Sequence, residues 1–214
     1  MTNLIEAICN IAEREAINVS DVSNNNNRAN LMGDALENYI KNAFADTFGV
    51  VDEEKRKQEF NKLFSYLGSR NHPPDLILNG GAAIEVKKIE SASTELQLNS
   101  SHPKALLSSD NPMLTDACRN CESWEYKDLI YCVGHVKRQR LKSLWMVYGN
   151  IYSAEQKIYN DIKNSVISGI RGAGIEDLSE TTEIGRVNKV DPLKISSLRI
   201  RGMWLIQNPR KVFE

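Results

Sequence analysis

Residues 73–88 constrain the fold of this chain more than any other segment. They read PPDLILNGGAAIEVKK, in which two apolar runs flank an Asn-Gly-Gly sequence at 79–81. Apolar runs on either side of a short glycine-containing segment are typical of a β-hairpin. We expect a three-residue loop there, because the last position of such a loop normally has positive φ and Gly81 tolerates that conformation.

The length of this loop decides which side chains meet. Glu85 and Lys87 share one face of the second strand, because side chains alternate across a strand. A three-residue loop pairs Leu78 with Ala82, and this register places Asp75 opposite Glu85 on the same face. A two-residue loop would move Asp75 to the other face. The sequence therefore predicts that two carboxylates and a lysine converge at one end of a sheet.

Two carboxylates beside a lysine can bind a divalent metal ion next to an attacking water. We expect Asp75 and Glu85 to bind Mg²⁺ through carboxylate oxygens, with the backbone carbonyl of Val86 as a further ligand. Lys87 would orient the nucleophilic water or stabilise charge on a phosphate. This is the PD-(D/E)xK arrangement of nucleases. The bare pattern arises by chance about once in a chain of this length, so a surface hairpin with charged ends is the alternative.

Glu37 is a fourth catalytic candidate, on a helix predicted for residues 34–48. Related nuclease folds often direct a helix glutamate toward the metal. Glu37 lies one residue from the apolar stripe of this helix. The alternative is a solvated glutamate on a helix whose N-cap is Asp34.

Composition narrows the class of protein. Hydrophobic residues make up 41% and charged residues 26% of the 214 residues, as in an ordinary soluble globular protein. We expect a single domain over 1–214, with a helical part at about 1–62 and a catalytic sheet core at about 63–214. Four cysteines without a secretory signal indicate a reducing cytoplasm, and no apolar run is long enough to span a bilayer. A net charge of −1 neither predicts nor excludes nucleic-acid binding.

Hydrophobic periodicity predicts an α/β fold with a central mixed β-sheet flanked by helices. Residues 91–112 are rich in Ser, Asn and Pro, and we expect a long irregular segment there. The predicted helices are 3–16, 34–48, 52–62, 113–123 and 154–170, and the predicted strands are the hairpin at 75–89 together with 128–136, 141–148 and 198–206.

Beyond the hairpin, several segments resemble the NgoPII-type restriction endonucleases, a small family of type II enzymes. These segments run from about residue 28 to about residue 210, so the resemblance covers nearly the whole chain. They are Gly33–Glu37, Ser65–Gly68, Pro73–Asp75, Ala83–Ile89, Leu98–Ser101, Gly134–Lys137 and Arg201–Trp204.

The resemblance implies a restriction-endonuclease-like PD-(D/E)xK fold, Mg²⁺ dependence and a homodimer. It also implies cleavage of double-stranded DNA at a short GC-rich palindrome such as GGCC, in a prokaryotic cytoplasm. A restriction enzyme needs a cognate DNA methyltransferase that modifies the same site, although the two proteins need not bind each other.

Candidate DNA contacts come from polar and basic residues outside the hairpin. Basic side chains neutralise phosphates, and Arg or Lys can read guanine in the major groove. The dense basic cluster at 137–142 is equally well explained as a solvated turn. The candidates are Asn99, Ser100, Ser101, Lys104, Lys137, Arg138, Arg140, Arg199 and Arg201, with Arg199 and Arg201 expected on one face of the last strand.

Two further groups of metal-binding residue types need separate explanation. Cys118, Cys121, Cys132 and His135 have a spacing that zinc sites tolerate. We favour buried thiols instead, because free cysteine behaves as a small apolar residue. His72, just before the catalytic strand, is a candidate contact to DNA or water, or simply a loop histidine.

The leading hypothesis is a site-specific deoxyribonuclease. One alternative is another PD-(D/E)xK enzyme, such as a repair or structure-specific nuclease. A second is a non-catalytic DNA-binding module with an incidental charged hairpin, and the complete set of Asp75, Glu85 and Lys87 argues against it.

Overall fold

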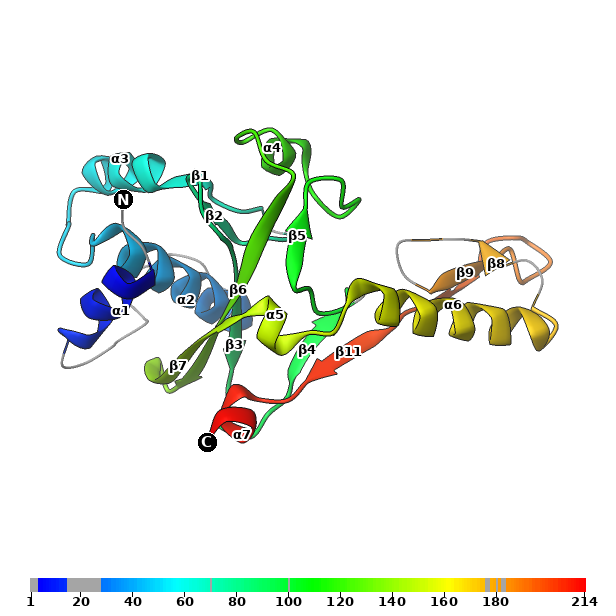
Figure 1. The fold of residues 1–214 in the computed structure, drawn as a ribbon. Helices are drawn as coiled ribbons and strands as arrows, with labels where there is room; N and C mark the ends of the chain where they lie inside the picture. Colours follow the sequence, from blue (N-terminus) through cyan, green and yellow to red (C-terminus); the bar gives the residue numbers. More distant parts are fainter. Residues whose placement is uncertain are drawn as a thin grey trace.

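A mixed β-sheet lies at the centre of the molecule (Figure 1). In this computed structural model the described residues are 4–14, 28–69, 71–99, 101–175, 178–179, 181 and 184–214. Strands follow the order β1-β2-β3-β6-β5, and β7 also pairs with β6. β3 and β6 are parallel, whereas the other neighbouring strands are antiparallel. The bounds are β1 (Phe64–Tyr66), β2 (Leu76–Leu78), β3 (Ala83–Ile89), β5 (Leu106–Ser108), β6 (Tyr126–Lys137) and β7 (Arg140–Tyr148).

Helices cover one face of this sheet. They are α1 (Leu4–Ala12), α2 (Arg28–Ala45) and α3 (Glu53–Leu63). Ile40 and Phe44 of α2 are fully buried and share one core with Ile84 of β3 and Ile130 of β6. Burying a side chain of this size contributes about 1.5–3 kcal/mol. The helical layer thus anchors the strand that carries Glu85, and the α/β fold with a central mixed sheet is confirmed.

A second core lies on the opposite face of the sheet. Ala83 of β3 and Tyr131 of β6 pack there with Leu96 and Leu107. β4 (Leu96–Asn99) pairs antiparallel with β11 (Met203–Ile206), which forms a separate two-stranded sheet. The short helices are α4 (Asp116–Arg119), α5 (Gly149–Tyr152) and α7 (Pro209–Phe213).

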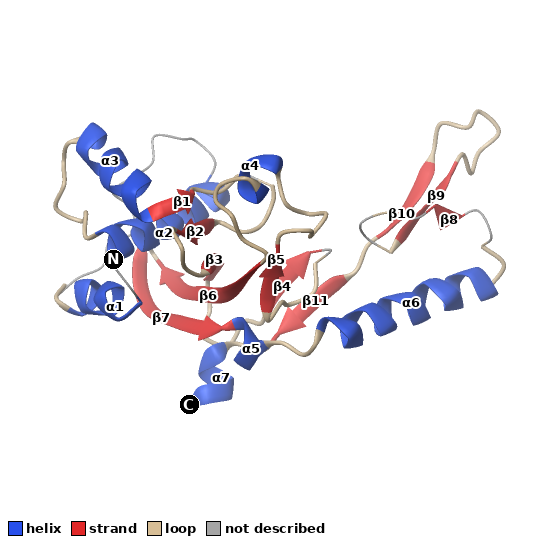
Figure 2. Ribbon diagram, turned by 45° about the horizontal axis from the view of Figure 1, so that its top comes forward, coloured by secondary structure: helices blue, strands red, loops and turns tan. Residues whose placement is uncertain are grey.

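An arm projects from the body of the molecule, as Figures 1 and 2 show from two directions. It comprises α6 (Gln156–Gly172) and a three-stranded sheet in the order β10-β9-β8. These strands are β8 (Leu178–Ser179), β9 (Gly185–Asn188) and β10 (Ser197–Ile200). No residue of α6 is fully buried. The arm therefore contributes little to either core.

Several sequence predictions need correction. Residues 91–112 contain β4 and β5 rather than an irregular segment, because Leu96 and Leu98 alternate into the second core. The predicted last strand, 198–206, is two strands in two different sheets, separated at 201–202. The second helix begins at Arg28, so Asp34 lies within it and is not its N-cap. The predicted helix at 113–123 is helical only at Asp116–Arg119.

None of the helices among the described residues has the length and apolar character needed to cross a membrane.

Candidate active site

The β2–β3 hairpin has the predicted register. Leu76 pairs with Ile84 and Ile77 with Ala83, and the backbone N–H of Leu78 donates to the carbonyl of Ala82 at 3.0 Å. Continuing this register away from the turn places Asp75 opposite Glu85. The three-residue loop at 79–81 is therefore confirmed. Positive φ occurs at Gly80 (65°) rather than at Gly81, so the position expected to need it was wrong by one residue.

Asp75, Glu85 and Lys87 line a single pocket of about 370 Å³. Lys87 donates from Nζ to Glu85 Oε1 at 2.5 Å. Asp75 accepts a hydrogen bond through Oδ2 from the backbone N–H of Val86 at 2.6 Å. Ile84 and Val86 point into the helical core, and side chains alternate along a strand. Glu85 and Lys87, together with Asp75 opposite Glu85, therefore lie on the sheet face away from the helices α1–α3. The predicted convergence is therefore present, on a hairpin whose neighbouring residues are buried.

The three ionisable groups influence one another strongly. Burial, followed by the charge of Glu85, raises the pKa of Asp75 to about 7. Burial lowers the pKa of Lys87, but the charges of Glu85 and Asp75 outweigh burial and raise that pKa above its ordinary value. Two carboxyl groups held this close favour a shared positive partner. Lys87 supplies one positive charge and remains protonated at neutral pH.

The donor set around Asp75 fits a hard divalent cation. Carboxylate and carbonyl oxygens are the ligands that Mg²⁺ prefers, and Mg²⁺ usually retains several waters. The N–H and C=O of a strand residue point to the same side. The backbone N–H of Val86 donates to Asp75. The carbonyl of Val86 therefore also points toward β2 and away from β6. Within the described residues no cluster of three or more His, Cys, Asp or Glu side chains is arranged to hold a metal, so backbone and water oxygens would complete this site.

Glu37 lies near the pocket but does not line it. Its charge is one of those that raise the pKa of Asp75, although it ranks last among the causes. Its carboxylate pairs with Lys41 one turn later in α2, at 2.6 Å, and Lys41 also reaches the carbonyl of Leu67 at 3.5 Å. Glu37 is therefore placed between the helical layer and the loop that precedes Asp75.

The pocket contains residues whose proximity the sequence did not reveal. Lys104, expected only as a DNA contact, lines it together with Gln97, His102 and Tyr131. Tyr131 lies opposite Glu85 in the parallel β3–β6 pair, and its hydroxyl accepts a hydrogen bond from the backbone N–H of Lys104 at 2.9 Å. Only knowledge of the β3–β6 register could have identified this contact, because 46 residues separate the two strand positions and no turn connects them directly.

A larger groove of about 870 Å³ opens beside the pocket. It lies between α6 of the arm and the segment after β5. Ser101, His102 and Lys104 line both hollows, so the pocket and the groove meet at these residues. His102 stacks on Tyr159 of α6 with ring centroids 4.9 Å apart.

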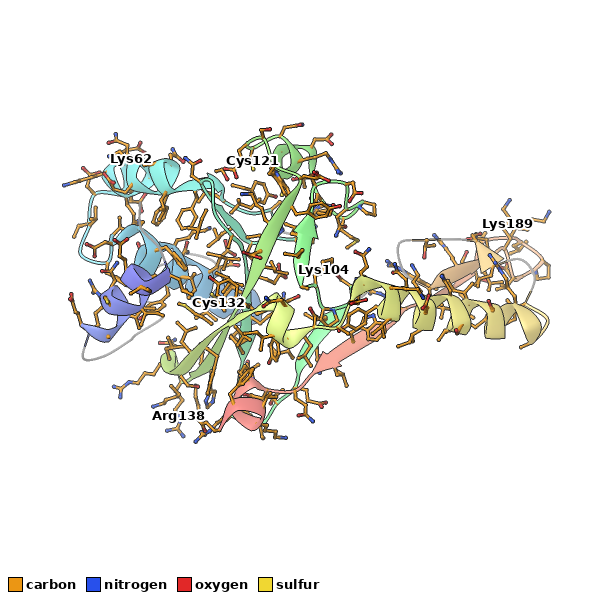
Figure 3. All side chains as sticks on the ribbon, viewed as in Figure 1. Lys62, Lys104, Cys121, Cys132, Arg138 and Lys189 are labelled. Carbon is orange, nitrogen blue, oxygen red and sulfur yellow. The ribbon has the colours of Figure 1, made fainter. Side chains whose placement is uncertain are left out.

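The remaining DNA candidates are dispersed over the molecule. Ser101 borders the pocket and the groove. Ser100 and the side chain of Asn99 lie outside the described residues. Lys137, Arg138 and Arg140 are exposed at the β6–β7 turn, which in Figure 3 is far from Lys104. Arg199 lies in β10 and Arg201 follows that strand, so the expectation that both occupy one face of a single strand is wrong.

The four zinc-type residues do not share a site. Cys118 is buried in the second core, whereas Cys132 is buried in the helical core on the other side of the sheet. Cys121 lies beside α4, and Cys132 lies midway along β6 (Figure 3). His135 instead contacts the carbonyl of Glu90 at 3.2 Å. His72 lines the same pocket as Asp75 and Glu85 and contacts Ser69 at 3.3 Å.

Comparison with known proteins gives a consistent result. The sequence model of the family described as NgoPII restriction endonuclease matches residues 2–214. The type II restriction enzyme NgoPII of Neisseria gonorrhoeae is 51% identical over 212 residues, which cover 99% of this chain and 76% of the relative. No solved structure matches the chain significantly.

Proposed function

Because the chain belongs to the NgoPII restriction endonuclease family and is thus a type II restriction enzyme, we propose that it cuts both strands of a short GC-rich palindrome such as GGCC. The reaction would require Mg²⁺, and the enzyme would act as a homodimer. The observation that carries this proposal is the meeting of Asp75, Glu85 and Lys87 in one pocket. The protein it resembles carries the same enzyme class in its name.

Asp75 and Glu85 would hold the metal ion, together with the carbonyl of Val86. The raised pKa of Asp75 supports this role, because a carboxyl group that resists ionisation beside another carboxylate gains most from a bound cation. Bound Mg²⁺ lowers the pKa of a coordinated water and neutralises charge that develops on the phosphate. Glu37 would act from outside the pocket, by orienting a water or by adding negative charge near Asp75.

Lys87 would act as a hydrogen-bond donor and not as a base. Its pKa is raised by Glu85 and Asp75, so it keeps its proton at neutral pH. An ammonium group in this position can hold the attacking water or donate to a phosphate oxygen. Its ion pair with Glu85 also fixes the orientation of that carboxylate.

Double-stranded DNA would occupy the groove next to the pocket, bounded by α6. Ser101 and Lys104 are the contacts nearest to the catalytic residues, and Arg199 and Arg201 would reach DNA from the arm. The other candidates are Asn99, Ser100, Lys137, Arg138 and Arg140. A two-fold homodimer would bring one Asp75–Glu85–Lys87 set to each strand of a palindrome. A DNA methyltransferase acting on the same site would protect the host genome without having to bind this protein.

Digestion of plasmid DNA tests this proposal directly. The purified protein should give discrete bands with Mg²⁺ and none with a chelator, and the cut ends should map to one palindromic sequence. Asp75→Asn is the matched control, because it removes one charge and preserves the shape of the side chain. A uniform smear, or cutting only at branched or single-stranded DNA, would instead favour a structure-specific nuclease.

A further inference from the structure

A second lysine, Lys104, lines the same pocket and forms no ion pair with a carboxylate of the described residues. Among the described residues, its Nζ contacts only the hydroxyl of Ser101 and the carbonyl of His102, the latter at 3.4 Å. Lys87 differs, because its ammonium group is held at 2.5 Å by Glu85. The pocket therefore contains one lysine in an ion pair and one lysine whose hydrogen-bond partners are neutral.

The surroundings of Lys104 compensate its charge only in part. Burial is the main effect on its pKa and lowers it, Glu85 raises it, and Lys87 lowers it further. Burial and the nearby lysines Lys104 and Lys163 lower the pKa of His102 to about 4, so His102 is neutral at physiological pH. A desolvated ammonium group with neutral contacts is costly to maintain. An anionic ligand bound next to Lys104 would offset this free-energy cost.

The position of Lys104 indicates which anion this is. Its side chain borders both the small pocket of Asp75 and Glu85 and the wide groove beneath α6. Figure 3 shows Lys104 between the central sheet and the beginning of α6. A duplex in the groove would offer its backbone phosphates to this junction, because the phosphates carry the negative charge of DNA on its outer surface.

The backbone of Lys104 is linked to the sheet beside the strand that carries Glu85. Its N–H donates to the hydroxyl of Tyr131 at 2.9 Å, and Tyr131 is paired with Glu85 between the parallel strands β6 and β3. Residues that act on a reacting group need such a supported position. Lys104 is thus placed by the sheet itself, although it belongs to the connection between β4 and β5.

We propose that Lys104 is a catalytic residue that binds the phosphodiester to be cleaved, with Ser101 as its hydrogen-bonding support. This proposal rests on the nuclease function proposed above. Lys87 and Lys104 then divide two tasks: Lys87 orients Glu85 and the attacking water, and Lys104 binds an oxygen of the scissile phosphate. Charge-assisted hydrogen bonds of this kind strengthen as negative charge accumulates on the phosphate.

A double-mutant cycle between the protein and the DNA tests this contact. Lys104→Met removes the charge and retains most of the side-chain volume. The matched DNA change is a methylphosphonate, which is uncharged, at the scissile position mapped by digestion. Each change alone should weaken duplex binding in a chelator by about tenfold to a hundredfold. The two together should be little weaker than either one, because both remove the same contact.

Lys62→Met is the control, since Lys62 lies on α3, on the far side of the molecule from Lys104 (Figure 3). The control variant should bind and cleave DNA as the unmodified protein does. The methylphosphonate should weaken DNA binding by the control variant as much as it weakens binding by the unmodified protein. Lys104→Met should also reduce the salt dependence of binding by about one counterion. The melting temperature of Lys104→Met without DNA should be unchanged or higher, because the substitution removes a buried ammonium group that has no ion pair with a described residue.

Two results would overturn the assignment of Lys104. One is additive losses from Lys104→Met and the methylphosphonate. The other is a lower melting temperature of Lys104→Met with unaltered affinity for the unmodified duplex, which would mark a structural lysine. In both cases the unmodified protein would still cut its DNA site, so the nuclease function would stand. Absence of any cleavage by the unmodified protein would instead contradict the proposed function.

Discussion

At the scale of single residues, burial and the neighbouring charges set the protonation of Asp75 in the candidate pocket. Burial and Glu85 raise its pKa to about 7, from an ordinary value of 3.8. The folded protein therefore binds a proton at Asp75 more tightly than the unfolded chain does. This group consequently lowers the stability of the metal-free protein as pH rises from about 4 to about 7.

Asp75→Asn should remove this pH-dependent loss. We expect the variant to exceed the unmodified protein in free energy of unfolding at pH 8 by on the order of 1–3 kcal/mol. The difference should shrink toward pH 4.5, where Asp75 is protonated in the folded protein. Urea denaturation in a chelator at both pH values measures it. A gain of the same size at both pH values would show that Asp75 does not titrate as described.

Lys87→Ala should abolish cleavage while leaving Mg²⁺ affinity equal or higher. Lysine is not a metal ligand, and its removal frees Glu85 from the ion pair at 2.5 Å. Titration calorimetry with Mg²⁺ and a single-turnover cleavage assay separate the two effects. Loss of metal binding in Lys87→Ala, with the fold intact by circular dichroism, would contradict these roles.

The residues of the site fall into two groups: those whose place in the pocket follows from local sequence, and those that only the tertiary fold brings there. Asp75, Glu85 and Lys87 are joined by one short hairpin, so strand alternation and loop length fix their geometry. Lys104 and Tyr131 reach the same pocket through the pairing of β3 with β6, which no turn connects directly. Sequence patterns describe the first kind of neighbour well and the second kind poorly.

At the scale of elements, the same distinction separates predicted from missed strands. β6 and β7 were predicted nearly to their ends, because they are long, apolar and joined by a tight turn. β4 was missed because its partner, β11, lies about a hundred residues later in the chain. The expected last strand was wrong because its two halves pair with different sheets, β10 with β9 and β11 with β4.

The β6–β7 turn offers a test of whether its basic cluster serves structure or DNA. Arg138 and Gln139 both have positive φ, at 50° and 63°, as in a type I′ turn, where Asn-Gly is preferred. The double substitution Arg138→Asn with Gln139→Gly should raise the free energy of unfolding by about 0.5–2 kcal/mol. A purely structural turn leaves cleavage unchanged, and its place beyond the end of β3 and far from Lys104 favours that result (Figure 3).

A clear loss of DNA affinity in this variant would show that the turn contacts phosphates. Arg138→Asn alone, with Gln139 retained, then serves to separate the loss of charge from the change in turn conformation.

The cysteines beside α4 should behave as packing residues. Cys118 is buried in the second core, and burial and the neighbouring Cys121 raise the pKa of its thiol to about 11, which disfavours the thiolate that zinc requires. Replacing both with Ser should cost roughly 1–3 kcal/mol of stability in total. Elemental analysis of the purified protein checks this, since stoichiometric zinc would contradict it.

At the scale of the whole molecule, the arm and the body border the groove that meets the pocket of Asp75, Glu85 and Lys87. The pocket is formed by the most locally encoded part of the chain, the β2–β3 hairpin. The groove instead depends on α6 and on residues near both β5 and β11, which are distant in sequence. The proposed catalytic residues were therefore predictable from one segment, whereas the proposed DNA-binding groove emerges only from the complete fold.

Symmetry provides the last prediction. A palindrome is read most simply by a two-fold dimer, so the protein should sediment at about 48 kDa, twice the 24.2 kDa of one chain, and bind one duplex per dimer. Affinity should fall steeply with salt as Lys and Arg contacts displace counterions. Arg199→Ala on the arm then distinguishes two roles. Loss of a guanine contact would cost about 1–3 kcal/mol and relax discrimination at one base pair, whereas loss of a phosphate contact would weaken binding to all sequences alike. A chain that remains monomeric on its cognate duplex and still cuts both strands in one event would contradict the dimer.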